Sequence, residues 1–491
     1  MKVEELDFSQ IDRMAYIDGE FVRISNDHAI QCLNPSNGEF ICEIAQCGED
    51  DVEQAVSSAR RAFISGEWSK MAPSNRKNIL LKFAKLIELN KEELALLESI
   101  DTGKPIRECH NFDLPLAINA MTWHAQAIDK MYGQVAPTAY DKVGMVVNEP
   151  LGVVAAITPW NFPLMLAVRK IAPALAVGNS VILKPSEKAS LTCLRLAELA
   201  ESAGVPRGIL QVLPGAGGST GKLLAIHKDV DCLAFTGSTL TGKKIIEYAG
   251  RSNMKRTFLE CGGKNANIVF EDCYDLDEAA KQAALAAFYN QGEICTAASR
   301  VLVEESVKDS FIELLLNHIE SMQPGDPLNS DSFMGALIDR DHFDKLISYI
   351  QLGVDEGADL LAGGLPLSID KGGYYIGPTI FDNVSSSMRI FQEEMFGPIL
   401  TVTGFNSSEE AIALANNSDY GLVSAVWSSD LKKCHQVAKS VRAGSVSINS
   451  WLGGDMSVPF GGMKQSGNGR DKSLHAMEKY TETKTIWVNL A

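Results

Sequence analysis

The feature that most constrains the fold is a regular alternation of short apolar strands and helices between Gly152 and Phe270. The predicted strands are GVVAAI, SVILKP, ILQVLP and CLAFTG, and a predicted helix follows each of them. Strands that alternate with helices along a chain favour a parallel sheet with helices on both faces. This segment therefore predicts an α/β domain.

A second block of alternating elements begins near Gly262. Its predicted elements are the helix DLDEAAKQAALAAFYNQG, the strand SRVLVEE, the helix SVKDSFIELLLNHIE, the strand ILTVTGF, the helix SSEEAIALANN and the strand SVSIN. This order predicts a second α/β domain. The C-terminal segment TKTIWVNL alternates in side-chain type and has no strand partner nearby in sequence. We expect it to be an edge strand that can join another subunit's sheet.

The charge balance argues against polyanionic partners. The chain of 491 residues has 45 Lys and Arg residues against 62 Asp and Glu residues, a net charge of −17. Such a chain lacks the basic footprint of nucleic-acid and anionic-membrane binding, so we expect neither partner. Residues 1–14 lack the apolar run of a secretion signal, and Pro159, Asn161 and Pro163 interrupt the most apolar stretch. We therefore expect a cytoplasmic protein.

The cysteines and histidines do not form a recognisable metal site. The ten cysteines are dispersed without a CxxC pair, and the eight histidines show no HExxH spacing. The pattern indicates free thiols in a reducing compartment and no bound metal.

A glycine-rich turn resembles a phosphate loop without completing one. The segment GSTLTGK, residues 237–243, follows a predicted strand and opens a predicted helix, a favourable place for phosphate. Lys244 stands where a P-loop has Ser or Thr, so the Mg²⁺-binding hydroxyl is missing. The GxGxxG fingerprint is absent too, and a tight turn remains the alternative to a cofactor site.

Three polar residues lie where chemistry or simple packing could explain them. Cys295 follows an apolar helix and Gly292, and packing is its ordinary explanation because nine other cysteines exist. Glu260 ends an apolar strand, a costly place for a carboxylate that has no partner, although capping of a helix is an alternative. Asn161, between Trp160 and Phe162, could donate to an oxyanion or close an Asx-turn.

Taken together, these segments resemble the aldehyde dehydrogenase superfamily. The motifs TPWNFP, LKPSE, FTGSTLTG, LECGGK, FYNQGEIC, EEMFGP and PFGGMKQSGNGRD occur in that family's order, and the resemblance extends from about residue 16 to the C-terminus. Within the superfamily, the chain is most similar to the bacterial γ-glutamyl-γ-aminobutyraldehyde dehydrogenases of putrescine breakdown. That similarity is strongest in DTGKPIR, in residues 113–115 and in MKQSGNGRDKSLHAMEKYTETKTIW.

The resemblance implies a three-part fold. It predicts a Rossmann-like NAD-binding domain from residues 1–130 and 151–261, and an α/β catalytic domain from residues 262–463. Residues 131–150 and 478–491 are expected to form a small β oligomerisation arm. Members of the family are dimers or tetramers, so a homodimer or homotetramer is expected.

The resemblance also implies the site residues. Cys295 matches the nucleophile, Asn161 the oxyanion donor and Glu260 the general base, with Lys170 and Asp471 in a proton relay. The residues expected to bind NAD are Trp160, Lys184, Glu187, Gly237, Ser238, Gly242, Glu394 and Phe396. The residues expected to line the substrate tunnel are Arg169, Phe162, Tyr289 and Trp451. The implied reaction oxidises an aldehyde to its carboxylic acid through a thiohemiacetal and a thioester on Cys295.

Three positions depart from the commonest family pattern. Glu293 stands in place of Gln, and its carboxylate would raise the pKa of the Cys295 thiol if it faced inward. Cys261 replaces an apolar residue beside Glu260, for packing or as a second reactive thiol. Asp471 replaces a Glu, and its shorter side chain is expected to need a water to reach Lys170.

Arg169 stands where most relatives carry Trp, whereas succinic semialdehyde dehydrogenases carry Arg there. Since a guanidinium suits a carboxylate, we expect an ω-oxo acid substrate, with an aminoaldehyde or γ-glutamyl-aminobutyraldehyde as the alternative. A salt bridge from Arg169 to Glu293 or Asp113 would remove that argument. A non-catalytic NAD-binding protein and a thiol esterase are the alternatives from other functional classes.

Overall fold

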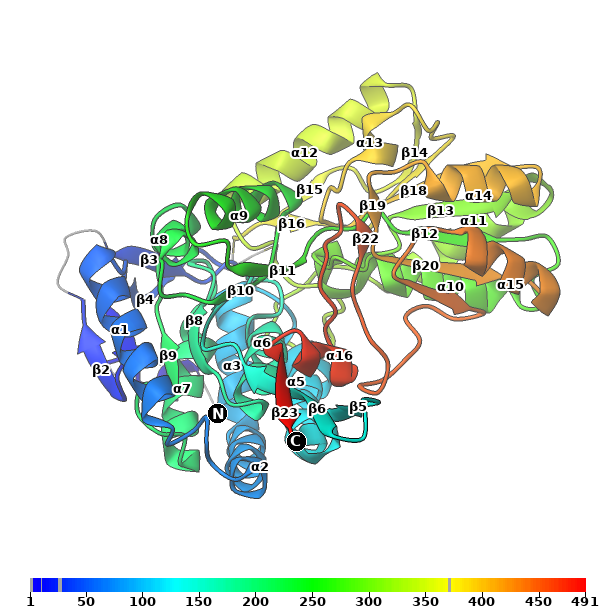
Figure 1. Cartoon of the computed structure of the whole chain (residues 1–491). Helices are drawn as coiled ribbons and strands as arrows, with labels where there is room; N and C mark the ends of the chain where they lie inside the picture. The colour runs from blue at the N-terminus through cyan, green and yellow to red at the C-terminus, as the bar shows by residue number, and fades with distance from the viewer. Residues whose placement is uncertain (1–2, 10, 25–28, 370–371) are drawn as a thin grey trace.

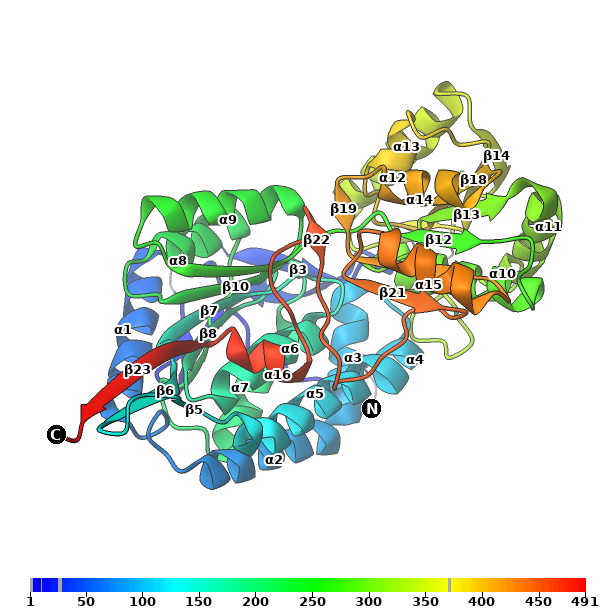
Figure 2. The same cartoon turned by 45° about the vertical axis from the view of Figure 1, so that its right-hand side comes forward.

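The computed structural model describes residues 3–9, 11–24, 29–369 and 372–491. Two lobes, each built around a seven-stranded sheet, lie side by side, and a small β ribbon extends from one of them (Figures 1 and 2). The expected α/β class, with a Rossmann-like lobe and a second α/β lobe, is confirmed. The helices of the described segments include none that is both long and apolar enough to cross a membrane.

The first sheet has the strand order β11-β10-β7-β8-β9-β1-β2. Its strands are β1 (Met14–Ile17), β2 (Glu20–Arg23), β7 (Val153–Ile157), β8 (Ser180–Lys184), β9 (Leu210–Val212), β10 (Cys232–Thr236) and β11 (Arg256–Glu260). Strands β7 to β11 run parallel. Every residue of β7, β8, β9 and β10 is buried, as expected for strands covered on both faces.

Helices cover both faces of this sheet (Figure 2). They include α1 (Glu49–Ser65), α6 (Pro163–Ala176), α7 (Leu191–Ala203), α8 (Lys222–Ile226) and α9 (Thr239–Arg251). A further layer packs on α6 and α7 and contains α2 (Pro73–Leu89), α3 (Lys91–Thr102) and α5 (Leu114–Ala127). The predicted helix after Ser219 is a single short turn of α-helix, because a π-helical turn takes up Gly217–Gly221.

The second sheet has the order β14-β17-β18-β13-β12-β20-β21, with β14 as its one antiparallel strand. Its strands are β12 (Ala266–Val269), β13 (Arg300–Glu304), β14 (Asp359–Ala362), β17 (Thr379–Asp382), β18 (Ile399–Phe405), β20 (Val423–Trp427) and β21 (Ser445–Ile448). Its helices include α10 (Leu276–Phe288), α11 (Lys308–Ile319), α12 (Arg340–Asp355), α14 (Ser408–Asn416) and α15 (Leu431–Ser440). Of these seven strands, β13, β18 and β21 were predicted from the sequence.

The β ribbon joins the C-terminal segment to a distant part of the chain. Strand β23 (Thr481–Asn489) pairs antiparallel with β6 (Lys142–Pro150) along its whole length, and β6 also pairs with β5 (Gln134–Ala136). Six consecutive residues of β23 are exposed, so its alternating side chains do not alternate in burial. Both faces of the ribbon are therefore open to solvent within one chain. Its outer edge has no strand partner among the described residues.

The chain returns to the first lobe after the second sheet is complete. Residues 460–471 run back past the end of β11, where Phe460 and Asp471 form an antiparallel bridge. Helix α16 (Ser473–Glu478) then packs against α6. Strand β22 (Met463–Lys464) of this return lies beside the junction of the two lobes, whereas β23 extends away from the second lobe (Figure 2).

Candidate active site

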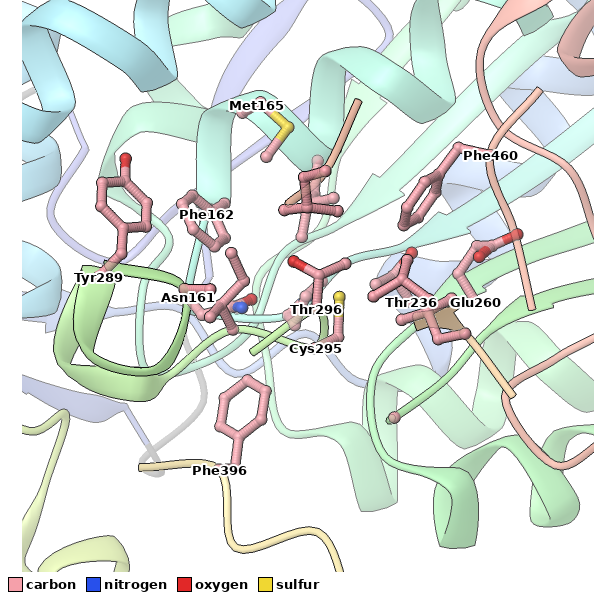
Figure 3. A pocket seen from close by; sticks show the side chains of 18 of the residues that line it. Asn161, Phe162, Met165, Thr236, Glu260, Tyr289, Cys295, Thr296, Phe396 and Phe460 are labelled. Carbon is pink, nitrogen blue, oxygen red and sulfur yellow. The ribbon is translucent and has the colours of Figure 1, made fainter. Parts of the chain in front are cut away.

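A cavity of about 940 Å³ lies between the two lobes. Of the residues expected from sequence, it is lined by Asn161, Glu260, Cys295, Asp471, Trp160, Gly237, Ser238, Glu394, Phe396, Arg169, Phe162, Tyr289 and Trp451. Asn161, Cys295 and Thr296 lie near one another on its wall, with Glu260 beyond Thr236 on one side and Phe162 and Tyr289 on the other (Figure 3). The described residues contain no cluster of three or more His, Cys, Asp or Glu side chains able to hold a metal ion.

A strained turn presents Cys295 to this cavity. Asn290, Gln291 and Gly292 all adopt left-handed conformations after α10, with φ of 52°, 56° and 69°. A Cβ at position 292 would lie 2.3 Å from the Gly397 backbone, so only glycine allows this close approach. Burial, then the carboxylates of Glu394 and Glu260, raise the pKa of the Cys295 thiol to about 12, against the opposing effect of Arg169. The thiol therefore needs a proton acceptor before it can act as a nucleophile.

Asn161 is buried at the start of α6 and is fixed from two sides. Its Nδ2 donates to the Glu293 carbonyl oxygen at 2.9 Å, while its backbone carbonyl oxygen accepts from Lys104 Nζ at 3.1 Å. Because a side-chain amide has two N–H donors, one remains for an oxygen atom in the cavity. Such a donor next to a thiol can stabilise a developing oxyanion.

Glu260 is a buried carboxyl group without a hydrogen-bond partner. It ends β11, and neither of its carboxyl oxygens has a partner within the described chain. Burial, and then the nearby charge of Asp471, raise its pKa to about 8. A Cβ at position 461 would lie 2.7 Å from Glu260 Oε1, so Gly461 leaves space for the carboxyl group. A group with this pKa can exchange protons near neutral pH.

A buried charge cluster lies behind Glu260. Lys170 Nζ lies 2.9 Å from Asp471 Oδ2, and Lys479 pairs with the other carboxyl oxygen of Asp471. The expectation that Asp471 needs a water to reach Lys170 was wrong, since the contact is direct. Although burial opposes it, the two lysines hold the pKa of Asp471 well below its usual range.

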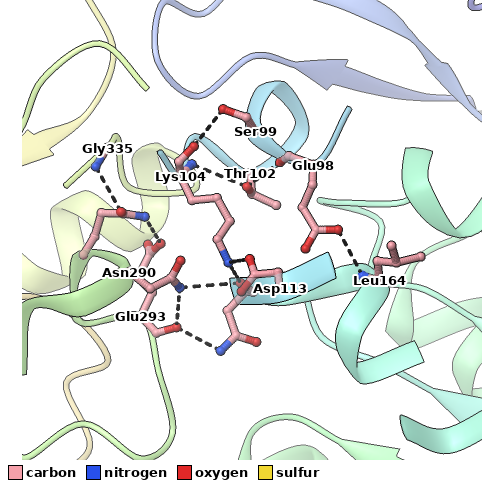
Figure 4. A network of polar contacts seen from close by, with 11 residues as sticks. Glu98, Ser99, Thr102, Lys104, Asp113, Leu164, Asn290, Glu293 and Gly335 are labelled. Carbon is pink, nitrogen blue, oxygen red and sulfur yellow. Dashed lines mark hydrogen bonds and ion pairs between the residues drawn. The ribbon is translucent and has the colours of Figure 1, made fainter. Parts of the chain in front are cut away.

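Glu293 does not act on the thiol in the way the sequence suggested. Its carboxyl group accepts from the Ile338 backbone N–H at 3.1 Å, and the charged groups with the largest effects on the pKa of Cys295 are Glu394, Glu260 and Arg169. Its carbonyl oxygen accepts from both Asn161 and Asn290 (Figure 4). Glu293 therefore ties the Cys295 turn to Asn161.

Lys104 is an important residue that the sequence analysis did not single out. Its Nζ pairs with Asp113 (Figure 4), at 2.5 Å from Oδ2. The same Nζ lies 3.8 Å from the centre of the Phe162 ring and donates to the backbone carbonyl oxygen of Asn161. The available signal was its position in DTGKPIR, where Gly103 ends α3 with φ 77° and the chain turns inward. A lysine in such a turn, followed by Pro105, is not an ordinary surface residue.

Arg169 lines the cavity without an ionic partner. The predicted salt bridges to Glu293 or Asp113 are absent, because Asp113 pairs with Lys104 and the Glu293 carboxylate accepts from Ile338. Arg169 forms no hydrogen bond or ion pair with any residue in the described ranges, and its Nε is buried. Phe162 and Tyr289 stack nearby at 6.5 Å between ring centres.

One side of the cavity fits a dinucleotide. Gly237 and Ser238 lie at the N-terminus of α9, a helix of 13 residues whose dipole favours phosphate. Glu394 Oε1 accepts from the Gly263 N–H at 2.9 Å, which leaves its other oxygen free to accept from a ribose hydroxyl. Trp160 and Phe396 meet edge to face, with 5.4 Å between their ring centres, and line this side of the cavity with aromatic surface.

Three predicted cofactor residues do not line this cavity. Lys184 Nζ and Glu187 Oε2 pair at 3.2 Å near Gly217, outside the cavity. Gly242 is buried, and a Cβ there would lie 2.8 Å from Cys261 Sγ. The small size of Gly242 therefore allows α9 to pack on Cys261, and its place at the pyrophosphate stays a prediction.

Comparisons with known proteins agree with this geometry. The family model described as "Aldehyde dehydrogenase family" matches residues 21–486. The NADP/NAD-dependent aldehyde dehydrogenase PuuC of Escherichia coli is 50% identical, over 98% of this chain and 96% of its own. Aminoacetaldehyde dehydrogenase of Pseudomonas aeruginosa is 44% identical over 98% of this chain and 96% of its own.

Solved structures show the same agreement. The γ-glutamyl-γ-aminobutyraldehyde dehydrogenase of Burkholderia cenocepacia is 49% identical, with a TM-score of 0.97 over 100% of this chain and 98% of its own. The P. syringae indole-3-acetaldehyde dehydrogenase AldA, solved with NAD⁺ and IAA, is 51% identical, with a TM-score of 0.98 over 99% and 98% of the two chains. The chain therefore belongs to the aldehyde dehydrogenase family.

Proposed function

We propose that this family member oxidises aldehydes of polyamine breakdown, aminoaldehydes or γ-glutamyl-γ-aminobutyraldehyde, to their acids with NAD⁺. The activity rests on one observation: a cavity that fits a dinucleotide on one side also holds the Cys295 thiol, the Asn161 amide and the unpartnered Glu260 carboxyl group. A simple binding protein has no need of a buried carboxyl group that has no partner, because such a group is costly to keep.

Cys295 begins the proposed reaction. Its thiolate attacks the aldehyde carbon, forms the C–S bond and shifts the carbonyl electron pair onto oxygen. The free N–H of Asn161 donates to that oxygen, with Lys104 holding the Asn161 backbone in place. Gly237, Ser238 and Glu394 would hold NAD⁺, which would accept the hydride of the thiohemiacetal; loss of that hydride, as the C–H bond breaks, leaves a thioester on Cys295.

Glu260 completes the reaction. Its carboxylate takes a proton from water, and the hydroxyl oxygen attacks the thioester carbon as the C–S bond breaks. Asp471, held between Lys170 and Lys479, offers a buried polar route along which the proton leaves. In this proposal Trp160 and Phe396 would lie beside the nicotinamide end of the cofactor, and Lys184 and Glu187 would contact its adenosine ribose.

The comparisons favour the polyamine-type substrate over the short ω-oxo acid expected from Arg169. PuuC and the B. cenocepacia enzyme match almost the whole chain at 50% and 49% identity, and one of them is named for γ-glutamyl-γ-aminobutyraldehyde. The ω-oxo acid remains the second candidate, because Arg169 has no ionic partner in the described chain.

A substrate panel tests the proposal. Formation of the carboxylic acid should be measured with aminobutyraldehyde, γ-glutamyl-γ-aminobutyraldehyde, succinic semialdehyde and butanal, each with and without NAD⁺, and NADH formation should be followed where NAD⁺ is present. Activity that needs NAD⁺ excludes a thiol esterase, and any turnover excludes a non-catalytic protein. A kcat/KM highest for succinic semialdehyde would reject the polyamine-type assignment.

We also propose how the chain is divided into domains and how its subunits assemble. Residues 1–130 and 151–261 would form the NAD-binding domain, residues 262–463 the catalytic domain, and residues 131–150 with 478–491 the arm of a cytoplasmic homodimer or homotetramer. Exposed apolar side chains on the ribbon, among them Val135, Ile486 and Trp487, support an interface there. Light scattering coupled to size exclusion would give the number of subunits.

A further inference from the structure

A second cation, Lys472, lines the same cavity as Arg169. Its ammonium forms no ion pair or hydrogen bond in the described parts of the chain, and its Nζ lies 5.6 Å from the centre of the Phe460 ring. Burial and the positive charge of Arg169 lower the pKa of Lys472 to about 8, so the two cations lie within each other's field. Two unpaired like charges beside one cavity are unfavourable without an anion.

The carboxyl groups around this pair do not neutralise it. Asp471 is bound by Lys170 and Lys479, and Asp113 by Lys104. Glu260, with a pKa raised to about 8, is mostly protonated near pH 7. Asp455 attracts Lys472 but is exposed, and its Oδ1 accepts from Ser457.

The backbone holds Lys472 in an unusual conformation. Lys472 and Ser473 have φ of 60° and 51°, a left-handed pair that costs free energy in residues other than glycine. Hydrogen bonds between Asp471 and Phe460, in both directions, and from the Ser473 N–H to the Met456 carbonyl keep the segment in this shape. The strain is therefore maintained by the surrounding structure, at a position beside the cavity.

We propose that Arg169 and Lys472 form an anion subsite that binds a carboxylate of the aldehyde substrate. This inference rests on the proposed function and specifies its substrate: an aldehyde that carries a carboxylate, in preference to one with only an ammonium group. The α-carboxylate of a γ-glutamyl group and the terminal carboxylate of a short ω-oxo acid offer the same chemistry. Of the two substrate classes in the proposed function, the subsite therefore selects γ-glutamyl-γ-aminobutyraldehyde, because the two cations disfavour the ammonium group of a simple aminoaldehyde.

Matched substrate pairs test the subsite. They also distinguish the two possible carboxylates, that of a γ-glutamyl group and that of a short ω-oxo acid. The first pair is succinic semialdehyde and butanal; the second is γ-glutamyl-γ-aminobutyraldehyde and the N-butyryl analogue, which lacks the α-carboxylate and α-ammonium groups. We expect the kcat/KM ratio of carboxylated to neutral substrate to reach about ten- to a hundredfold in at least one pair, as for a charge-assisted hydrogen bond. The pair in which the carboxylated substrate is preferred identifies which of the two carboxylates the subsite binds.

The variants Arg169→Gln and Lys472→Gln should each lower that ratio about tenfold, and Arg169→Lys should retain part of it. Arg107→Gln is the matched control, because Arg107 lines the same cavity but pairs with Glu108 at 3.2 Å. Succinate should inhibit butanal oxidation competitively, with a Ki about tenfold weaker in Arg169→Gln, which tests binding even where turnover is slow.

The subsite is rejected if neither pair shows a ratio above about threefold, if the variants slow both members of a pair equally, or if Arg107→Gln lowers the ratio as much. Failure of the proposed function would give another result. In that case the unaltered enzyme would form no NADH even with the neutral substrates, butanal and the N-butyryl analogue.

Discussion

The buried pair of Lys104 and Asp113 provides a quantitative test of how the site is supported. Both side chains are only 1% exposed, and Glu98, with a pKa raised to about 8 by burial, lies close to them. Lys104→Met keeps the length of the side chain and removes its charge and its donor to Asn161. Breaking one partner of a buried pair costs about 3–5 kcal/mol, because a carboxylate stays buried without its cation. The free energy of unfolding should fall by that amount.

The activity of Lys104→Met should also fall, for a reason that is independent of its lower stability. The Asn161 carbonyl loses its bond from Lys104 Nζ, so the amide that donates to the oxyanion is no longer fixed. A small misplacement of such a donor lowers kcat by roughly ten- to a hundredfold. The double variant Lys104→Met/Asp113→Leu removes both charges and should recover most of the stability, since apolar replacement of a buried pair is close to neutral. It should not recover kcat.

Urea titrations followed by tryptophan fluorescence, at one fixed protein concentration, would measure stability, and NADH formation with butanal would measure activity. Lys85→Met is the matched control, because Lys85 pairs with Glu88 on the surface, where the side chain is 61% exposed. Its effect should stay within about 0.5 kcal/mol. A loss below about 1 kcal/mol in Lys104→Met, or a double variant no more stable than the single one, would refute the reasoning.

The remaining predictions concern the reaction itself. Cys295→Ala should abolish NADH formation while NAD⁺ binding by calorimetry is retained; residual turnover would contradict the assignment of the nucleophile. Glu260→Gln should give one burst of NADH and then stop, because thioester hydrolysis needs the base, whereas equal loss of burst and steady state would make Glu260 structural. Because Glu260 with a pKa of about 8 acts when deprotonated, steady-state kcat should rise as pH rises through about 8, and a flat profile would argue against this role. Glu187→Ser should narrow a preference for NAD⁺ over NADP⁺, measured as a ratio of kcat/KM, since the carboxylate repels a 2′-phosphate; an unaltered enzyme that prefers NADP⁺ would contradict this.

The fold was predictable where the chain repeats one pattern. Strands β7 to β10 are uniformly apolar and alternate with helices, so their parallel pairing followed from the sequence. Strands β14 and β17 were not named, because β14 is largely exposed and β17 lies between turns, where no helix precedes it closely. The pairing of β23 with β6 joins segments more than 300 residues apart, and nothing in either segment specifies the partner.

The candidate site was predictable as a set of residues and not as a set of contacts. The motifs identified Cys295, Asn161 and Glu260, which all line one cavity in the structure. A glycine at the start of a helix, such as Gly242, can serve phosphate binding or packing. Its distance to Cys261 shows a packing role that the sequence did not reveal, while its role at the pyrophosphate stays a prediction. The same limit applies to Asp471, whose reach depends on where α6 places Lys170.

Charge in a buried site is the hardest property to read from sequence, because it depends on which groups pair. Glu293 and Arg169 were expected to influence each other or the thiol, yet the Glu293 carboxylate bonds to a backbone N–H and Lys104 neutralises Asp113. Each carboxylate that could have neutralised Arg169 is thus occupied elsewhere or protonated. The pairing of its neighbours leaves Arg169 without an ionic partner among the described residues, although the sequence made it look equally suited to a structural salt bridge. Under the proposed anion subsite, Lys104, which the sequence did not single out, would bear on specificity as well as on stability.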